Sequence, residues 1–348
     1  MKTLLIVMPS MSGGGAERVV SHLLKQWSEI EVELHLALVY PRSGFSYEIP
    51  KNVILHELNC RKVFYSIFKL NKLIKKIQPD VVFSSMLNVN SVLSFIKYFH
   101  STWKLVIREN SVISKNIKHE NFGGLRKLAY TWLYPHANRI ICQSKDMASE
   151  LIEINESLKE NIRVIHNPTF IKRDNTENPF LGEGPHVLMV GRLSKEKRCE
   201  YAIQKFVECR AKFKKANLWF VGEGPEEQEL KSLAKNLNLE DCIHFKGFQK
   251  EINHWYSFCD LYLLCSSHEG YPNSLLEALS LGCSVLVEKH SGGTLELMKE
   301  FKQNERYVEK LDLTDASLFE SKTLSVNSKK NEERTQEIID SYHSVVFK

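Results

Sequence analysis

Two glutamates that could bind a ligand lie eight positions apart in the stretch SSHEGYPNSLLEALSLG, residues 266–282. Pro272 disfavours helix in the residue before it, so we expect Glu269 to lie in a turn that precedes a helix. Ser274 and Glu277 fit the S-x-x-E capping box, in which the glutamate bonds back to the N-cap amide. A carboxylate also accepts hydrogen bonds from pairs of sugar hydroxyls. Both a cap and a polyol contact are therefore open for Glu277, whereas the cap leaves Glu269 unexplained.

Two basic residues follow another expected strand, in the sequence VGRLSKEK. A guanidinium from Arg192 and an ammonium from Lys197 would suit a diphosphate, which needs its charge neutralised when it leaves. The alternative is a solvated basic turn, because Lys195 and Arg198 stand in the same segment.

Glycine-rich loops follow further strands. In SMSGGGAERVV, residues 10–20, three glycines let backbone N–H groups approach a ligand, and the next helix would offer its positive end to a phosphate. The alternative is a flexible turn. The segment is not G-x-G-x-x-G, and no acidic residue clearly ends the second strand, so a dinucleotide site is disfavoured. Similar glycines occur in GEGPEEQEL (222–230) and HSGGTLELM (290–298).

The elements that must position these residues alternate between short apolar runs and helical patterns. This alternation predicts an α/β fold with doubly wound parallel sheets. The expected strands are 3–8, 32–40, 81–85, 104–108, 139–144, 186–191, 216–222, 242–247, 261–266 and 284–288.

The chain has 348 residues, about twice the usual length of one domain. The segment 167–185 is rich in Pro, Gly, Asn and charge, so we expect two domains joined near residue 175. Ligands of such sheets bind beyond the carboxyl ends of the strands. The cleft between two facing domains is then the expected site.

The composition is that of an ordinary globular protein, with 43% hydrophobic and 26% charged residues. No stretch approaches the ~20 apolar residues of a membrane span. The apolar run TLLIVM near the N-terminus is too short for a signal peptide. Eight scattered cysteines without C-x-x-C predict reduced thiols in a cytoplasmic protein rather than a disulfide frame or zinc site.

Charge is distributed unevenly. Residues 1–174 hold 24 Lys and Arg against 15 Asp and Glu, a net +9, whereas residues 175–348 hold 23 against 27, a net −4. A basic first half suggests anionic lipid, a phosphorylated substrate or nucleic acid as partner. The sequence has no aromatic-basic RNP string or zinc finger, so we expect no nucleic-acid partner.

Together these segments resemble the retaining glycosyltransferases of family 4, which have the GT-B fold of two Rossmann-like domains. The resemblance covers most of the chain, and its most specific part is the E-x7-E spacing within EGYPNSLLEA. The matching strings are GGGAERVV, QPDVVFSS, VIHNP, VGRLSKEK, VGEGPEEQEL, IHFKGF, SHEGYPNSLLEALSLGCSVLV and GGTLEL.

The resemblance implies a division of labour among domains. Residues 1–170 would form the acceptor-binding domain and residues 171–330 the donor-binding domain. Residues 331–348 would form a helix that crosses back to the first domain.

The resemblance also assigns roles to the candidate site residues. Arg192 and Lys197 correspond to the basic pair that grips the donor's diphosphate and stabilises the leaving nucleoside diphosphate. Glu269 would face the hydroxyls of the transferred sugar, and Glu277 would accept from the ribose. We assign catalysis to Arg192, Lys197 and Glu269. Further donor contacts are implied for Gly14, Gly15, Gly270, Asn273, Ser274 and Leu275.

A departure from the family pattern follows the strand 104–108. Many members carry a histidine there, but this chain has Arg108, Glu109 and Asn110. The R-x-N form resembles a subgroup that handles N-acetylated hexosamines, so these three residues are candidates for contact with the acceptor or the donor sugar. Position 284 is Ser where Pro is usual, and the segment after 297 lacks the glycine-bearing strand common in the family.

The implied reaction moves a hexose or N-acetylhexosamine from a nucleotide sugar, by family frequency a UDP-sugar, with retention of configuration. No D-x-D triplet occurs, so we expect no metal requirement and no other cofactor. We expect no protein nucleophile, because the leaving phosphate would help take the acceptor's proton.

The segment 61–77 predicts a basic amphipathic helix, with Lys62, Lys69, Lys72 and Lys76 on roughly one face. Such a face attracts anionic lipid at ~1 kcal/mol per basic residue. The alternative is a core-packed helix with solvated lysines. With the basic first half, the pattern favours a lipid-linked saccharide acceptor, peripheral contact with the inner face of a bacterial cytoplasmic membrane, and a role in capsule, O-antigen or exopolysaccharide assembly.

Two other functions fit the same residues. A nucleotide-sugar epimerase of this fold would need acid–base groups but no acceptor. A non-catalytic protein that binds sugar nucleotides is disfavoured, because all four charged donor positions, Arg192, Lys197, Glu269 and Glu277, are present.

Overall fold

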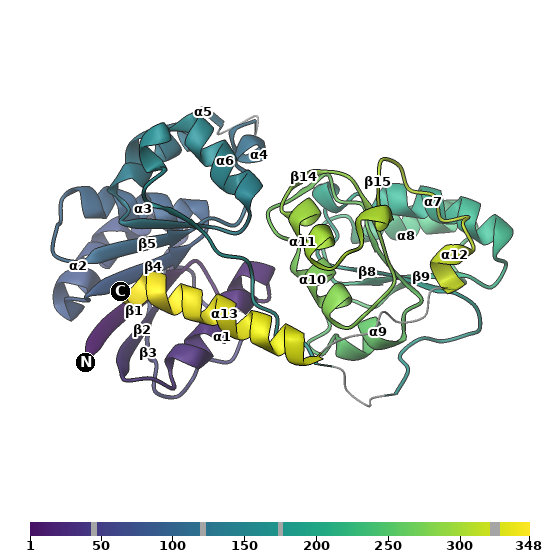
Figure 1. The fold of residues 1–348 in the computed structure, drawn as a ribbon, viewed down its shortest axis with the longest axis horizontal. Helices are drawn as coiled ribbons and strands as arrows, with labels where there is room; N and C mark the ends of the chain where they lie inside the picture. Colours follow the sequence, from purple (N-terminus) through teal and green to yellow (C-terminus); the bar gives the residue numbers. More distant parts are fainter. Residues whose placement is uncertain (43–46, 119–122, 173–176, 321–327) are drawn as a thin grey trace. The chain divides into compact units, whose positions relative to one another are not determined.

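The chain folds into two α/β units (Figure 1). The computed structural model describes residues 1–42, 47–118, 123–172, 177–320 and 328–348. Unit 1 comprises Met1–Pro168 and Arg334–Lys348, and unit 2 comprises Thr169–Glu333. The expectation of two parallel-sheet α/β domains is confirmed.

Unit 1 is built on a seven-stranded sheet with the order β3-β2-β1-β4-β5-β6-β7. Every neighbouring pair is parallel. The chain winds outward in one direction from β1 and in the other from β4, so a topological switch point lies between these two strands. The strands are β1 (Lys2–Met8), β2 (Val32–Leu38), β3 (Ile54–Glu57), β4 (Val81–Ser85), β5 (Lys104–Arg108), β6 (Arg139–Cys142) and β7 (Ile162–Val164).

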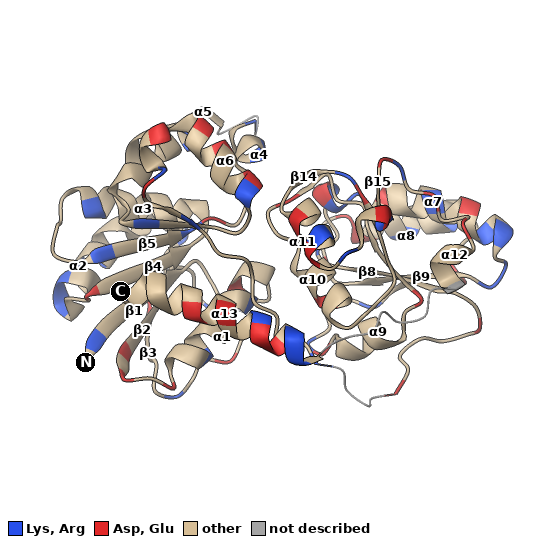
Figure 2. Ribbon diagram, in the orientation of Figure 1, with Lys and Arg blue, Asp and Glu red and all other residues tan. Residues whose placement is uncertain are grey.

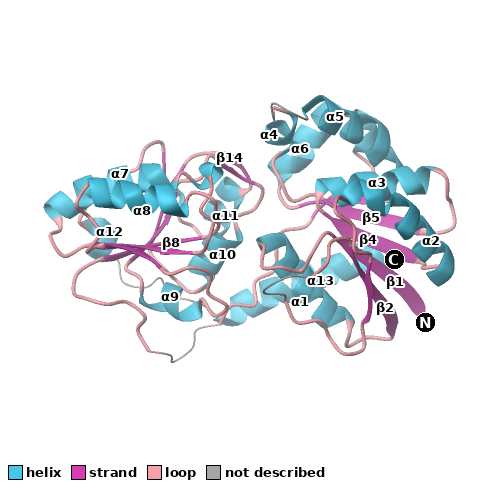
Figure 3. Cartoon of the chain, turned by 180° about the vertical axis from the view of Figure 1, so that it is seen from behind, coloured by secondary structure: helices cyan, strands magenta, loops and turns pink. Residues whose placement is uncertain are grey.

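Helices cover both faces of this sheet, because its central strands are apolar on both sides. One face packs against α1 and α13, where Trp27 meets Phe83 and Phe347 edge to face at 5.6 and 5.8 Å between ring centroids. The other face packs against α2, α3, η2, η3 and α6 (Figure 3). The helices are α1 (Gly15–Trp27), η1 (Val63–Ser66), α2 (Ile67–Ile77), α3 (Leu87–Tyr98), α4 (Ile113–Ile117), α5 (Gly123–Leu128), η2 (Ala129–Leu133), η3 (Tyr134–His136), α6 (Lys145–Ile154), η4 (Glu156–Leu158) and α13 (Ser328–Phe347).

Unit 2 repeats the plan with a six-stranded sheet of order β10-β9-β8-β11-β13-β15, again parallel throughout. Its switch point lies between β8 and β11. A separate two-stranded parallel ladder joins β12 and β14. The strands are β8 (His186–Val190), β9 (Asn217–Val221), β10 (Ile243–Phe245), β11 (Leu261–Leu264), β12 (His268–Glu269), β13 (Val285–Glu288), β14 (Ser291–Gly292) and β15 (Tyr307–Val308).

The helices of unit 2 also lie on both faces of its sheet, and each face has its own apolar core. They are η5 (Lys195–Lys197), α7 (Cys199–Lys212), α8 (Glu227–Asn236), α9 (Asn253–Phe258), α10 (Asn273–Ser280), α11 (Thr294–Glu300), η6 (Asn304–Arg306) and α12 (Ser317–Glu320). No helix in the described residues is both long and apolar enough to cross a membrane.

Five strands escaped prediction. The two-residue strands β12 and β14 pair only with each other, and β3, β7 and β15 each lie at the edge of a sheet. An edge strand has one neighbour and is partly exposed, as in β7, where two of three residues are exposed. Such strands lack a continuous apolar run. β15 lies in the charged segment after residue 297 that we expected to lack a strand, and it pairs with β13.

A buried arginine ties the C-terminal helix to the sheet of unit 1. Arg108 ends β5 and has no solvent exposure. Its Nε donates to the Tyr342 hydroxyl of α13 at 2.9 Å, and its other nitrogens donate to Asn167 Oδ1 at 2.6 Å and Ser85 Oγ at 3.2 Å. One guanidinium therefore joins two strand ends, the segment that leaves unit 1 and the helix that returns to it.

This network predicts that Tyr342→Phe destabilises unit 1. Removing the hydroxyl leaves a buried charged donor without its acceptor, which costs about 1.5–3 kcal/mol. We expect a lower midpoint in thermal and urea unfolding. Tyr65→Phe is the control, because Tyr65 is exposed and should leave the midpoint unchanged. Equal midpoints for the two variants would contradict an anchoring role for Arg108.

Candidate active site

The candidate site of unit 2 starts where β8 ends, beside the switch point of the sheet. Two loops approach each other there so closely that side chains are excluded. A Cβ on Gly222, which has φ of +141°, would lie 2.0 Å from the backbone oxygen of Gly191. Gly191 itself has φ of +148°, which favours glycine. The loop after β8 is therefore fixed against the loop after β9.

That loop carries Lys197 toward the chain after β11. The Lys197 amide donates to the Ser194 carbonyl at 2.8 Å, which closes the short helix η5. The Ser267 amide donates to the Glu196 carbonyl at 2.7 Å and joins the two loops. The Lys197 side chain passes Gly191, where an added Cβ would lie 3.6 Å from Cε.

The structure brings Lys197 and Glu269 together. Lys197 Nζ lies 2.5 Å from Glu269 Oε1, and the two side chains are 21% and 14% exposed. Burial would lower the pKa of Lys197, but the Glu269 carboxylate outweighs it and raises that pKa. Burial would likewise raise the pKa of Glu269, but Lys197 and the Ser266 hydroxyl lower it. Both groups are therefore charged at neutral pH.

One oxygen of Glu269 carries the internal contacts. Oε1 accepts from Lys197 and from Ser266 Oγ, the latter at 2.7 Å. Within the described part of the chain, Oε2 has no hydrogen-bond partner. Glu269 thus combines a fixed orientation with one acceptor that a hydroxyl group could use.

The ladder between β12 and β14 places a histidine beside this pair. Glu269 pairs with Gly292, two residues after His290. The ring of His290 is held by the Ser291 carbonyl at 3.0 Å and Thr294 Oγ1 at 3.2 Å. Burial lowers the pKa of His290, so the imidazole is neutral at pH 7, and both Glu269 and Lys197 act on it electrostatically.

The helix α10 begins beside Glu269, but not with the expected capping box. The N-cap is Pro272, without a side-chain cap bond, so Ser274 lies inside the first turn. The Ser274 hydroxyl accepts from Tyr262 at 2.8 Å. The assignment of Ser274 as the N-cap is therefore wrong, because the helix begins at Asn273, two residues before the Leu275 start that a Ser274 cap requires.

The start of α10 still presents backbone donors. Leu276 N–H is bonded to Pro272 C=O at 3.0 Å, as expected for a helix that begins at Asn273. The amides before it, including those of Ser274 and Leu275, have no partner within the helix. Asn273 and Ser274 are partly exposed, and Gly270 is buried with its carbonyl bonded to the Gly293 amide.

Glu277 lies on α10 and is almost fully buried. Its Oε2 accepts from the Tyr256 hydroxyl of α9 at 3.1 Å. A tyrosine from a different helix therefore helps to orient this carboxylate.

Arg192 is exposed, unlike the other candidate donor residues of unit 2. It follows Gly191 directly, in the same loop as Lys197. Its guanidinium has no hydrogen bond or ion pair with any residue that the structure describes. The site of unit 2 thus offers a solvated guanidinium, a paired ammonium, an available carboxylate oxygen and a helix start, which together suit an anionic ligand that also carries hydroxyls.

Gly14 and Gly15 lie in unit 1, at the start of α1. Gly14 is the N-cap, and a Cβ there would lie 2.1 Å from Glu17 Oε2. Glu17 is buried and accepts from Ser10 Oγ at 3.1 Å, and burial raises its pKa. The glycines therefore make room for a carboxylate of their own helix. Contact of Gly14 and Gly15 with a donor stays a prediction.

Arg108, Glu109 and Asn110 lie together after β5 of unit 1, but two of them are fully buried. Glu109 accepts from the Tyr134 hydroxyl at 2.6 Å, and burial raises its pKa. Arg108 contacts Asn110 and binds α13 through Tyr342. Arg108 and Glu109 serve the interior of unit 1 in this structure, so only the partly exposed Asn110 presents a side chain for a sugar contact, which stays a prediction.

Three residues of these sites were missed from the sequence: Glu17, Tyr256 and His290. Glu17 and His290 flank glycine pairs, in GGAE and HSGG, and that neighbourhood was an available signal. Tyr256 gave none, because it lies 21 residues from Glu277 on a separate helix. Among the described residues, no group of three or more His, Cys, Asp and Glu is placed to hold a metal ion.

Comparison with known proteins gives matches across both units. Residues 13–173 match the model of Glycosyltransferase Family 4, and residues 171–334 match that of Glycosyl transferases group 1. The chain is 30% identical over 313 residues to N-acetylgalactosamine-N,N'-diacetylbacillosaminyl-diphospho-undecaprenol 4-alpha-N-acetylgalactosaminyltransferase of Campylobacter jejuni, a match that covers 85% of this chain and 83% of that relative.

Two further proteins are similar. The lipopolysaccharide core biosynthesis glycosyltransferase LpsD of Rhizobium meliloti is 25% identical over 289 residues, 80% of this chain and 76% of the relative. The crystal structure of Anabaena HepE in complex with UDP and glucose superposes with a TM-score of 0.74 at 17% identity, over 99% of this chain and 100% of that one. The structural likeness shows a shared fold.

The ion pair in unit 2 predicts a pH-dependent stability effect of Glu269→Gln. The variant leaves the Lys197 ammonium without its counter-charge, which should lower the free energy of unfolding by about 2–3 kcal/mol at pH 7. The folded pKa of Glu269 is lowered, so its contribution is present above the unfolded pKa and is lost as pH falls through the folded pKa. The deficit of the variant should therefore shrink as the pH falls below the ordinary pKa of a glutamate.

Urea unfolding of the wild type, Glu269→Gln, Lys197→Met and the double variant at several pH values measures this effect. The double variant should be more stable than the sum of the single changes implies, since the two groups interact directly. Additive changes, or a deficit that does not vary with pH, would contradict the pairing.

Proposed function

Because this chain belongs to glycosyltransferase family 4, with the GT-B fold, we propose that it transfers a hexose or N-acetylhexosamine from a nucleotide sugar to a lipid-linked saccharide, with retention of configuration. The observation that carries the proposal is the Lys197–Glu269 pair beside the start of α10, at the switch point of unit 2. Ligands of doubly wound sheets bind at this place.

The donor's diphosphate supplies the charge that this site can neutralise. Arg192 has a solvated guanidinium in the loop of Lys197, and both would bind phosphate oxygens. The amides at the start of α10 add oriented donors. When the sugar–phosphate bond breaks, negative charge grows on the leaving group, and fixed positive charges stabilise that transition state more than the ground state.

Glu269 and Glu277 would position the hydroxyl groups of the donor. Oε2 of Glu269 would accept from the transferred sugar, since Oε1 is held by Lys197 and Ser266. Glu277, oriented by Tyr256, would accept from the ribose. We assign no nucleophile. In the proposed reaction the leaving phosphate takes the acceptor's proton on the same face, and no metal or cofactor is required.

The proposed donor is UDP-linked and the proposed acceptor carries a lipid diphosphate. Support comes from the Campylobacter jejuni relative, whose name gives a saccharide on diphospho-undecaprenol and an N-acetylgalactosaminyl group, and from HepE, which binds UDP and glucose. LpsD supports a role in bacterial surface polysaccharide or lipopolysaccharide assembly. The protein would act in the cytoplasm at the inner face of the membrane, with the lysines of residues 61–77 attracted to anionic lipid.

Donor binding predicts a specific effect of the basic pair. The double variant Arg192→Ala, Lys197→Ala should lose at least about tenfold in affinity for UDP in isothermal titration, because two charge-assisted contacts are removed. Lys195→Ala is the control, since Lys195 is exposed in the same turn. A panel of nucleotide sugars then identifies the donor by its thermal stabilisation. Unchanged UDP affinity in a folded double variant would refute the assignment.

Turnover separates a transferase from an epimerase. A transferase releases nucleoside diphosphate only when a lipid-linked saccharide is added, whereas an epimerase interconverts nucleotide sugars without an acceptor.

Tyr256→Phe tests the ribose contact, because it removes the hydroxyl that orients Glu277. We expect it to weaken nucleotide binding by about three- to tenfold. If Glu277→Ala lowers stability and leaves nucleotide affinity intact, Glu277 is structural.

A further inference from the structure

We propose that unit 1 inserts a band of exposed aromatic side chains into the interfacial layer of an anionic bilayer. The six residues of this aromatic band are each between 60% and 85% exposed. They are Phe64, Tyr65, Phe68, Tyr98, Phe99 and Trp132. Large apolar side chains are normally exposed singly, so a group of this size on neighbouring elements marks an interaction surface.

The elements that carry the aromatic band cover the same face of the sheet. Leu70 of α2, Ile96 of α3 and Tyr130 of η2 all point inward to one core cluster. Neighbouring elements also touch at the surface. His100 Nε2 lies 3.0 Å from Asn71 Oδ1, which joins the end of α3 to α2. The band therefore belongs to one side of unit 1 and does not consist of scattered residues.

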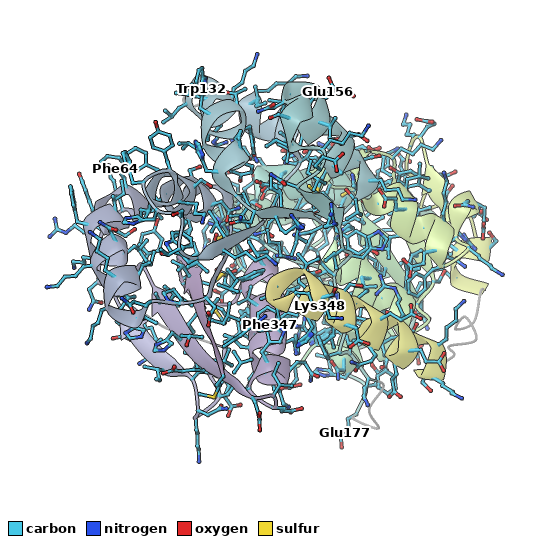
Figure 4. All side chains as sticks on the ribbon, turned by 60° about the vertical axis from the view of Figure 1, so that its left-hand side comes forward. Phe64, Trp132, Glu156, Glu177, Phe347 and Lys348 are labelled. Atoms are coloured by element: carbon cyan, nitrogen blue, oxygen red, sulfur yellow. The ribbon has the colours of Figure 1, made fainter. Side chains whose placement is uncertain are left out.

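A second contact joins the remaining part of the band. The ring of Tyr98 at the end of α3 lies 4.9 Å from that of His136, which follows η2 in η3. Figure 4 shows Phe64 of η1 and Trp132 of η2 projecting outward. For residues 61–77 the sequence left open a lipid-attracting helix or a core-packed helix with solvated lysines, and the structure adds exposed aromatic side chains to the exposed lysines. Ile74 is buried as a core-packed helix requires, but Phe64 and Phe68 face solvent.

Charge identifies lipid as the occupant. Residues 58–138, which include η1, α2, α3 and η2, contain 12 Lys and Arg besides the buried Arg108, against two Asp and Glu besides the buried Glu109. On α2, Lys72 and Lys75 lie on the same helix face as Phe68, because they follow it by four and seven residues, and all three are exposed. Figure 2 shows blue segments, Lys and Arg, on α2.

A protein partner would need an acidic surface to match the lysines and a pocket to hold each ring. The bilayer interface accepts aromatic rings and basic residues together and needs no such pockets. Phe and Leu enter the acyl boundary, Tyr and Trp lie at the headgroups, and basic residues pair with anionic lipid. The inference goes beyond the lysine contact already proposed for residues 61–77, because insertion is apolar and should persist at high salt.

Trp132 is a natural probe of insertion. The chain has five tryptophans. Trp132 is 69% exposed, whereas Trp27, Trp103, Trp219 and Trp255 are at most 4% exposed. Vesicles of phosphatidylglycerol and phosphatidylcholine with brominated acyl chains should quench and blue-shift the fluorescence of the wild type. Trp132→Phe should abolish most of this response. Quenching that persists in Trp132→Phe would overturn the proposal, and so would the absence of quenching in the wild type.

Vesicle flotation at low and high salt distinguishes insertion from charge attraction. The double variant Phe68→Ser, Phe99→Ser should reduce partitioning by at least about tenfold at both salt concentrations, since it removes two aromatic side chains that the bilayer would bury. Lys72→Ser, Lys75→Ser should reduce it at low salt only. The control is Leu181→Ser, an equally exposed apolar residue of unit 2. Lipid insertion would be overturned if high salt abolished the partitioning of the wild type. It would also be overturned if the wild type formed a stable dimer that Phe68→Ser, Phe99→Ser dissociates. No sugar nucleotide is present, so these results are independent of the proposed reaction.

Discussion

A fully parallel sheet must hide both of its faces, and this constraint shapes both units. Helices have to lie on each side, so every strand must be followed by a crossover and all carboxyl ends meet at one edge. The chain then has to reverse its winding direction once in each sheet, between β1 and β4 in unit 1 and between β8 and β11 in unit 2. Loops that follow those strands diverge, which leaves room beside them. The candidate residues of unit 2 lie at such strand ends, and so do Gly14 and Gly15 of unit 1, whereas Arg108, Glu109 and Asn110 follow β5, the strand next to β4.

The two units use this edge differently. In unit 2 the edge holds charge that a ligand can reach: a paired lysine, a carboxylate with one oxygen available and a solvated arginine. In unit 1 the corresponding charge is internal. Arg108 and Glu109 have no exposure, and their partners are Tyr342 and Tyr134. The first arrangement suits exchange of an anionic ligand, whereas the second fixes the C-terminal helix on the sheet.

The sequence predicted the central strands and the fold class, because strands buried on both faces appear as continuous apolar runs. The edge strands β3, β7 and β15 could not be predicted, since each has at most four residues and only one neighbouring strand. The candidate residues Lys197 and Glu269 were identified separately, but their ion pair joins positions 72 residues apart and depends on tertiary packing. The capping box failed because Pro272 itself became the N-cap.

The lysine that would bind a diphosphate is already paired in the structure, and this pairing has a consequence for selectivity. An unpaired ammonium in a half-buried loop would be costly, so Glu269 stabilises Lys197 in the absence of ligand. A phosphate must then compete with that carboxylate, and a simple anion gains less than it would from a free lysine. A ligand that also offers a hydroxyl to Glu269 Oε2 regains this lost binding free energy, because the hydroxyl donates a new hydrogen bond to the carboxylate. The pair therefore favours a phosphate that is linked to a sugar over phosphate alone.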